Sequence, residues 1–160
     1  MREQLLSIIE KNSRIDLKEV AIILGCEEET VINELQEMEE EGIICGYHTM
    51  INWDKTNVDK VMALIEVRVT PQRGRGFDQV AERIYQYPEV SSCYLMSGAY
   101  DIMVILEGKT LKEVAGFVTD KLSTIDDVTS TATHFILKKY KDHGTVMKKR
   151  KKDEREVFTP

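Results

Sequence analysis

The apolar positions at the start of the chain recur at the spacing of amphipathic helices. Residues 2–12, 17–24 and 28–41 each place their apolar side chains on one stripe. Asp16 is in position to cap the second of these helices, and Gly25 follows its last apolar residue as a C-terminal cap does. We therefore expect three short helices with a tight turn between the second and the third.

Residues 43–52, IICGYHTMIN, are rich in the β-branched and aromatic side chains of a strand or short hairpin. Three helices followed by a β-element predict a winged helix-turn-helix over residues 1–47, a fold that places its last helix in the DNA major groove. The alternative is a small three-helix bundle with no nucleic-acid role. The polar, turn-rich residues 48–60 predict a linker.

The pattern changes after residue 60. Strand-like and helical segments now follow one another: strand 61–69, helix 77–87, strands 90–98 and 100–108, helix 110–125 and strand 128–140. This βαββαβ order predicts a ferredoxin-like domain over residues 61–140. Its four strands can bury one face beneath the two helices, and we expect a second copy of the chain to cover the other face. The predicted fold class is α+β, a winged helix-turn-helix followed by a ferredoxin-like βαββαβ domain.

Charge is distributed unevenly along the 160 residues, whose formal net charge is −6. Residues 1–45 hold 4 basic and 12 acidic side chains, whereas residues 138–152 hold 8 basic and 1 acidic. We therefore expect a charged C-terminal tail over residues 141–160. Because no apolar run is long enough to cross a bilayer and the N-terminus lacks the pattern of a cleavable signal, we expect a cytoplasmic protein without a membrane partner.

Several motifs resemble those of the Lrp/AsnC family, the leucine-responsive and asparagine regulators of bacteria and archaea. They are the helix-turn-helix with Gly25 and Gly42, the junction EEEGIICGY at 39–47, the turn SGAYD at 97–101, and the threonine pair of STAT at 130–133. The resemblance covers nearly all of residues 2–140. It implies a DNA-binding winged helix and a second domain that senses an amino acid, forms the homodimer and often assembles further into octamers.

The resemblance also implies where the effector binds. The family's pocket lies near the turn matched here by Gly98, Tyr100 and Asp101, with the threonine pair at Thr131 and Thr133. An amino acid needs an acceptor for its ammonium group, which Asp101 can supply, and donors for its carboxylate, which Gly98 and its neighbours or the threonines can supply. The alternative is a plain tight turn between antiparallel strands, with glycine at positive φ and Tyr100 packed below.

The third helix departs most strongly from the family. Residues 27–42, EEETVINELQEMEEEG, contain eight glutamates and no lysine or arginine, whereas DNA-binding relatives carry arginines there. By spacing, four side chains point outward: Glu34, Gln36, Glu37 and Glu40. The candidates for DNA contact on this helix are Thr30, Asn33 and Gln36. A carboxylate about 8 Å from a phosphate is repelled by roughly 0.5 kcal/mol in water, and four such groups by roughly 2 kcal/mol, so we expect this helix to bind DNA poorly in the ordinary way.

The positive charge of the basic tail can compensate for the repulsion between the acidic third helix and DNA. Its candidate phosphate contacts are Lys148, Lys149 and Arg150. Three alternatives remain for the tail: it pairs with the acidic helices within or between subunits, it contacts nucleic acid, or it has no partner.

No arrangement of residues typical of catalysis or cofactor binding is present. The three histidines are scattered and the three cysteines lie far apart, which predicts neither a metal site nor a disulfide framework. We therefore do not expect an enzyme, and the resemblance to the Lrp/AsnC family implies a DNA-binding transcriptional regulator controlled by a small ligand, an amino acid. The alternative function is a ligand-sensing or scaffold protein whose acidic winged helix binds a protein partner in place of DNA.

Overall fold

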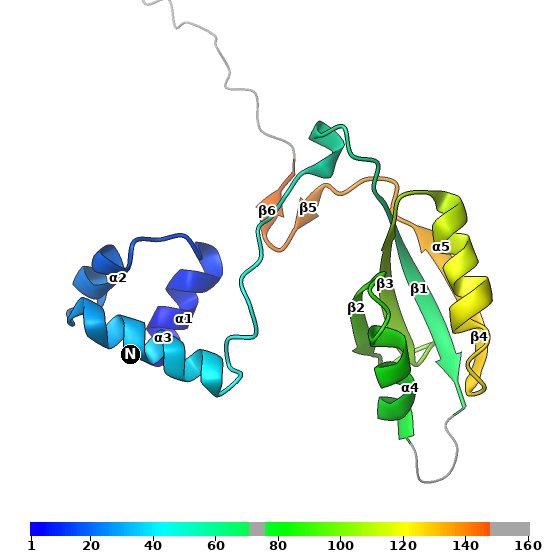
Figure 1. Ribbon diagram of the computed structural model, residues 1–160, viewed down its shortest axis with the longest axis horizontal. Helices are drawn as coiled ribbons and strands as arrows, with labels where there is room; N and C mark the ends of the chain where they lie inside the picture. Colours follow the sequence, from blue (N-terminus) through cyan, green and yellow to red (C-terminus); the bar gives the residue numbers. More distant parts are fainter. Residues whose placement is uncertain (71–75, 148–160) are drawn as a thin grey trace, which may run out of the picture. The chain divides into compact units, whose positions relative to one another are not determined.

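The computed structural model describes residues 1–70 and 76–147 (Figure 1). The chain falls into two compact units, of which the first is Met1–Ile51 and the second begins at Asn52. No helix in the described part of the chain is long and apolar enough to span a membrane.

The first unit contains three helices, α1 (Arg2–Lys11), α2 (Leu17–Leu24) and α3 (Glu28–Glu40). Their predicted caps are confirmed: the carboxylate of Asp16 accepts from the amide of Lys18 at 2.9 Å, and Gly25 adopts the left-handed conformation with φ +68°. Five side chains form the buried core of this unit: Leu5, Val20, Ala21, Val31 and Met38. Because the three helices share one core, the turn at Gly25 sets the direction in which α3 leaves α2.

The β-element predicted after α3 is not formed. Residues 43–51, all of which the structure describes, contain no strand. The amides of Ile43 and Ile44 instead both donate to the carbonyl of Met38, at 2.9 and 3.0 Å, and close the C-terminus of α3. An isolated pair of short strands is marginally stable without a third strand or a covering helix, so strand-like composition is not sufficient here. The winged part of the predicted fold is therefore wrong for the described residues, whereas its three helices are confirmed.

The second unit has the predicted βαββαβ order. Its elements are β1 (Val61–Val69), α4 (Gly76–Tyr85), β2 (Val90–Leu95), β3 (Ile102–Gly108), α5 (Leu111–Phe117), which continues as the π-helical turn η2 (Val118–Leu122), and β4 (Val128–Phe135). The strands form one sheet in the order β2-β3-β1-β4, and every neighbouring pair is antiparallel. The ferredoxin-like prediction is confirmed.

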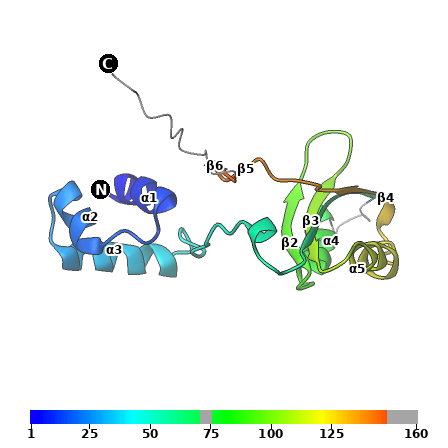
Figure 2. The ribbon, with the colours of Figure 1, turned by 90° about the horizontal axis from the view of Figure 1, so that it is seen from above.

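The two faces of this sheet differ in burial. Helices α4 and α5 lie against one face (Figure 2), where the core includes Ala63, Ile65, Val67, Ile102, Val104 and Leu106. On the opposite face the central strands present half-buried apolar side chains: Met62, Leu64, Met103 and Ile105. This alternation arises because successive residues of a strand point to opposite sides of the sheet.

Residues on both sides of the ferredoxin-like core extend the second unit. The short 3-10 helix η1 (Trp53–Lys55) precedes β1, and the ammonium of Lys60 lies 4.6 Å from the centre of the Trp53 ring. A hairpin of β5 (Lys141–Asp142) and β6 (Thr145–Val146) follows β4, and the side-chain amide of Asn52 donates to the carbonyl of Met147 at 2.8 Å. The later part of the predicted linker and the start of the predicted tail therefore contact each other within this unit.

Candidate DNA-contacting and ligand-binding sites

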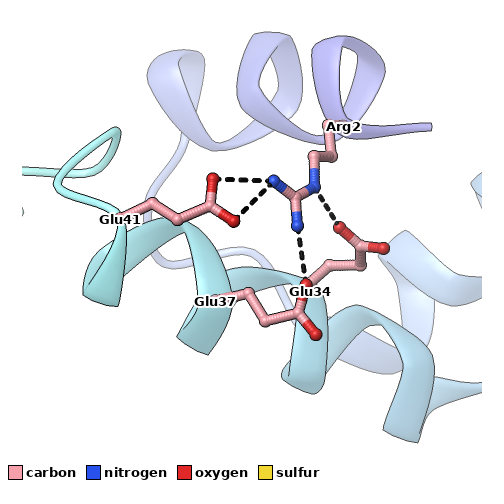
Figure 3. A network of polar contacts seen from close by, with 4 residues as sticks. All are labelled: Arg2, Glu34, Glu37 and Glu41. Carbon is pink, nitrogen blue, oxygen red and sulfur yellow. Dashed lines mark hydrogen bonds and ion pairs between the residues drawn. The ribbon is translucent and has the colours of Figure 1, made fainter.

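The first candidate site is the surface of α3, where Arg2 at the start of α1 holds three glutamates (Figure 3). Its Nε donates to Glu34 at 2.7 Å and its Nη2 to Glu37 at 2.6 Å. Its Nη1 donates to both carboxylate oxygens of Glu41, at 3.1 and 2.9 Å. These hydrogen bonds, first those to Glu34 and Glu41, raise the pKa of Arg2 above its ordinary value and keep it charged.

This network corrects the expected orientation of Glu34. Glu34 and Glu37 were expected to point outward and both pair with Arg2, but the side chain of Glu37 is 59% exposed whereas that of Glu34 is only 23% exposed. Glu39 accepts from the hydroxyl of Tyr47 at 2.7 Å, a hydrogen bond that raises the pKa of Tyr47. The physical reason is that Glu34 turns toward the cation on α1, whereas Glu37 and Glu41 pair with the same cation and stay exposed.

A second stripe of α3 remains free and exposed. It consists of residues at i, i+4, i+7 and i+11, which share one face of a helix: Glu29, Asn33, Gln36 and Glu40. Thr30 is also exposed, but Glu34, Glu37 and Glu41 follow it at i+4, i+7 and i+11, which puts it on the stripe that faces Arg2. The structure thus brings Asn33 and Gln36 onto one solvent-facing stripe, whereas Thr30 lies on the stripe that faces Arg2. The other predicted DNA contacts, Lys148, Lys149 and Arg150, lie outside the described residues.

The second candidate site is the connection between β2 and β3. The strands end at Leu95 and begin again at Ile102, so the turn is longer than the tight turn expected between 98 and 100. It is closed by a hydrogen bond from the amide of Met96 to the carbonyl of Asp101 at 2.8 Å. The amide of Asp101 donates in turn to the carbonyl of Val67 on β1, at 3.1 Å. The turn is therefore fixed to the central strand of the sheet.

The carboxylate of Asp101 also has a structural partner. Its Oδ2 accepts from the amide of Val69 at 2.8 Å, next to the register shift between Arg68 and Val69 where β1 leaves its regular pairing with β4. Oδ1 accepts no hydrogen bond from the described residues. Asp101 thus holds the end of β1 with one oxygen and keeps the other available.

The threonine pair lies on the other side of β1. Thr131 is opposite Val67 and Thr133 is opposite Ile65, so both half-buried side chains lie on the helix-covered face of the edge strand β4. Val67 is also paired with Ile102, the residue after Asp101. Since neighbouring strands lie about 4.8 Å apart, the end of the turn and Thr131 are separated by roughly 10 Å across β1. The structure therefore places Thr131 in line with the end of the turn, whereas Thr133 lies two residues further along β4, opposite the centre of β1.

Gly98 and Tyr100 differ in what the fold requires of them. Gly98 is exposed, its φ lies outside the left-handed range, and a Cβ added there would meet nothing within 4 Å. The expectation of a glycine at positive φ is therefore wrong, and the backbone of the turn accepts other residues at this position. Tyr100 is half-buried, with its hydroxyl 3.8 Å from the sulfur of Met103.

Arg2 and Tyr47 were not among the site residues predicted from the sequence. One signal was present: Arg2 stands at the start of an acidic segment, and Glu34, Glu37 and Glu41 follow the i, i+3, i+7 spacing of a single helix stripe.

No group of three or more histidine, cysteine, aspartate or glutamate side chains within residues 1–70 and 76–147 is arranged to hold a metal ion.

The sequence profile of the Lrp/AsnC ligand binding domain matches residues 62–146, which span the whole sheet and the hairpin that follows it. The chain belongs to the Lrp/AsnC family. This is a family of transcriptional regulators, so the prediction of a regulator that is not an enzyme is confirmed.

Relatives with both units extend this assignment to nearly the full chain. This Lrp/AsnC protein is 48% identical over 158 residues to an uncharacterized HTH-type transcriptional regulator, YugG, of Bacillus subtilis, covering 98% of this chain and 95% of the relative. It is 31% identical over 137 residues to the HTH-type transcriptional regulator LrpA of Pyrococcus abyssi, covering 86% and 94% of the two chains. Its fold is similar to that of a transcriptional regulator from Neisseria meningitidis solved as an L-Met complex, with a TM-score of 0.67, 21% identity and coverage of 88% and 90%.

Proposed function

We propose that this Lrp/AsnC protein is a cytoplasmic regulator that binds DNA through the outer stripe of α3 and responds to an amino acid bound at the β2–β3 turn. The proposal of DNA binding is supported by the division of α3 into two stripes. The acidic stripe is neutralised in part by Arg2, and the outer stripe presents Asn33 and Gln36. Side-chain amides can form paired hydrogen bonds with adenine in the major groove.

This geometry lowers the electrostatic repulsion that α3 exerts on DNA. The outer stripe carries two carboxylates, Glu29 and Glu40, and Glu29 lies in the first turn of α3, where the helix dipole favours it. Two carboxylates at about 8 Å from phosphates oppose binding by roughly 1 kcal/mol in water. Specific protein–DNA complexes are stabilised by many times that amount, so the remaining repulsion lowers affinity without abolishing binding.

The ligand part of the proposal rests on the turn and on Gly98. A glycine that the backbone does not require leaves space beside backbone amides, and Asp101 offers its free Oδ1 as an acceptor for an ammonium group. Thr131 lies in the same row across the sheet as the end of the turn, and Thr133 lies two residues further along β4. The Neisseria meningitidis relative solved with L-Met supports an amino acid as the class of ligand.

We propose further that the chain forms a homodimer through the sheet face that α4 and α5 leave open, and that dimers can assemble into octamers. Met62, Leu64, Met103 and Ile105 give that face an apolar centre, and burying it requires a partner with the same character.

The DNA part is tested by fluorescence titration of labelled duplexes, one of random sequence and one from upstream of the protein's own coding sequence, across a salt series. Gln36→Ala is expected to weaken binding to the second duplex by roughly tenfold, the effect of about one base contact. Gln4→Ala, which removes the same side chain from the exposed face of α1, is the matched control and is expected to have no effect. Absence of binding to both duplexes at about 50 mM salt, where phosphate contacts are strongest, would refute DNA binding.

One observation favours the alternative function, a ligand-sensing or scaffold protein that binds a protein partner. Ile22 and Ile23 on α2 are 80% and 63% exposed, and adjacent exposed isoleucines are typical of a protein-binding surface. The same titration distinguishes the two functions, because only the alternative is compatible with a complete absence of DNA binding.

A further inference from the structure

Arg2 lies at an electrostatically unfavourable place in its own helix. It is the first residue of α1, where the unpaired backbone amides give the helix end a partial positive charge and where acidic residues are favoured. The side chain therefore does not stabilise α1 through the helix dipole. Its stabilising partners lie on α3, 32 to 39 positions further along the chain.

The C-terminus of α3 lacks the cation that such a helix end favours. Its last turn contains no basic residue and its C-cap is Glu41, although the partial negative charge of this end opposes carboxylates. Arg2 supplies the missing positive charge from α1, because two of its hydrogen bonds go to Glu41.

The geometry of the network also restricts how α3 can move. Glu34 and Glu41 are seven residues apart, so the contacts of one guanidinium extend over about 10 Å of the helix axis. Because a guanidinium is planar and its five donors have fixed directions, three carboxylates bound to it cannot rotate or slide together without losing hydrogen bonds. A lysine ammonium carries the same charge but imposes no such plane.

We propose that Arg2 is a positioning residue for DNA recognition, which fixes the rotation of α3 about its axis and so determines that the stripe with Asn33 and Gln36 faces the DNA. This role rests on the proposed DNA binding. It differs from simple neutralisation of charge, which would change affinity for every duplex equally.

The test measures two quantities on the full-length protein, the affinity for the random duplex and the preference for the upstream duplex over it. Arg2→Ala leaves three carboxylates without their cation, so affinity for the random duplex is expected to fall by roughly threefold to tenfold at low salt. The preference is expected to fall by roughly tenfold, since about one base contact is lost when α3 can rotate. Arg2→Lys is expected to retain the affinity and to lose most of the preference.

A charge-rescued variant separates positioning from neutralisation. Adding Glu34→Gln, Glu37→Gln and Glu41→Gln to Arg2→Ala removes every charge of the network. We expect this variant to recover the affinity for the random duplex without recovering the preference. Arg14→Ala is the matched control: it removes an exposed arginine of the same unit that forms no ion pair with any described residue, and it should leave the preference unchanged. Circular dichroism and thermal unfolding confirm that each variant is folded.

The outcomes are distinguishable. If the wild type binds neither duplex, the proposed function fails and the role of Arg2 fails with it. If the wild type shows a preference that Arg2→Ala retains, or that the charge-rescued variant recovers fully, only the positioning role is overturned. An equal loss of preference in Arg14→Ala would also overturn it, because the effect would then come from net charge alone.

Discussion

Asp101 is expected to have two separable roles, one in folding and one in ligand binding, and two substitutions distinguish them. Asp101→Ala removes both carboxylate oxygens and leaves the amide of Val69 without its partner at the end of β1. Asp101→Asn retains a carbonyl oxygen that can accept from the same amide, but it removes the charge that would bind an ammonium group.

The expected loss in the free energy of unfolding follows from the geometry of the hydrogen bond between Val69 and Asp101. Its donor and acceptor are 2.8 Å apart, and a hydrogen bond to a charged group contributes about 1.5 to 3 kcal/mol. Because Asp101 is half-buried, water can partly replace the lost acceptor, and we expect Asp101→Ala to lower the free energy of unfolding by about 2 kcal/mol. The neutral amide of Asp101→Asn should lower it by about 1 kcal/mol or less.

Two assays measure the two roles. Trp53 is the single tryptophan of the chain and lies in the second unit, so its fluorescence during urea unfolding reports the unit that contains Asp101. Calorimetric titration with a panel of L-amino acids measures ligand binding. We expect Asp101→Asn to remain folded and to bind the effector at least tenfold more weakly, as about 1.4 kcal/mol of lost charge-assisted hydrogen bonding implies.

Either half of this account can be refuted. Wild-type stability in Asp101→Ala would show that the hydrogen bond to Val69 contributes nothing. Wild-type affinity in Asp101→Asn, with the protein folded, would remove Asp101 from the ligand site.

Three further predictions concern the second unit. Ile65→Ala removes a fully buried side chain from the centre of β1 and should lower the free energy of unfolding by about 3 kcal/mol in a urea titration. Thr110→Ala removes the hydroxyl that accepts from the amide of Glu113 at 3.1 Å, and the lost cap should cost about 1 kcal/mol in the same assay. The ammonium of Lys121 lies 2.6 Å from Glu89 and lowers the pKa of that carboxyl below its ordinary 4.5. The ion pair therefore stabilises the fold at pH values above the ordinary pKa, and this stabilisation is lost as the pH falls through the lowered pKa. Urea titrations below pH 5 should show a smaller pH dependence for Glu89→Gln, and an unchanged dependence would contradict this assignment.

Local patterns were sufficient to predict the parts of the fold that depend on neighbouring residues. The strand-like pattern of residues 61–69, mostly apolar with polar Glu66 and Arg68 on the face away from the core, predicted β1 with its observed ends. The caps at Asp16 and Gly25 were predicted correctly because a helix end must satisfy its backbone groups with residues within one turn.

The parts that were missed depend on contacts between distant residues. The pairing of Arg2 with Glu41 spans 39 positions, and only the packing of α1 on α3 brings them together. The hydrogen bond from Val69 to Asp101 spans 32 positions, and it lengthened the turn beyond the strand ends that the alternating pattern indicated. The turn itself and the threonine pair could be found only through the resemblance, since neither motif carries a specific chemical pattern.

The central claim is that an amino acid bound in the second unit controls the binding of DNA by the first. The most direct test is the affinity of the full-length protein for the upstream duplex with and without a saturating amino acid from the calorimetric panel. We expect the amino acid to change this affinity by roughly fivefold or more, in either direction, and the duplex to change the affinity for the amino acid by the same factor. An amino acid that binds in calorimetry but leaves the affinity for DNA unchanged would contradict the claim.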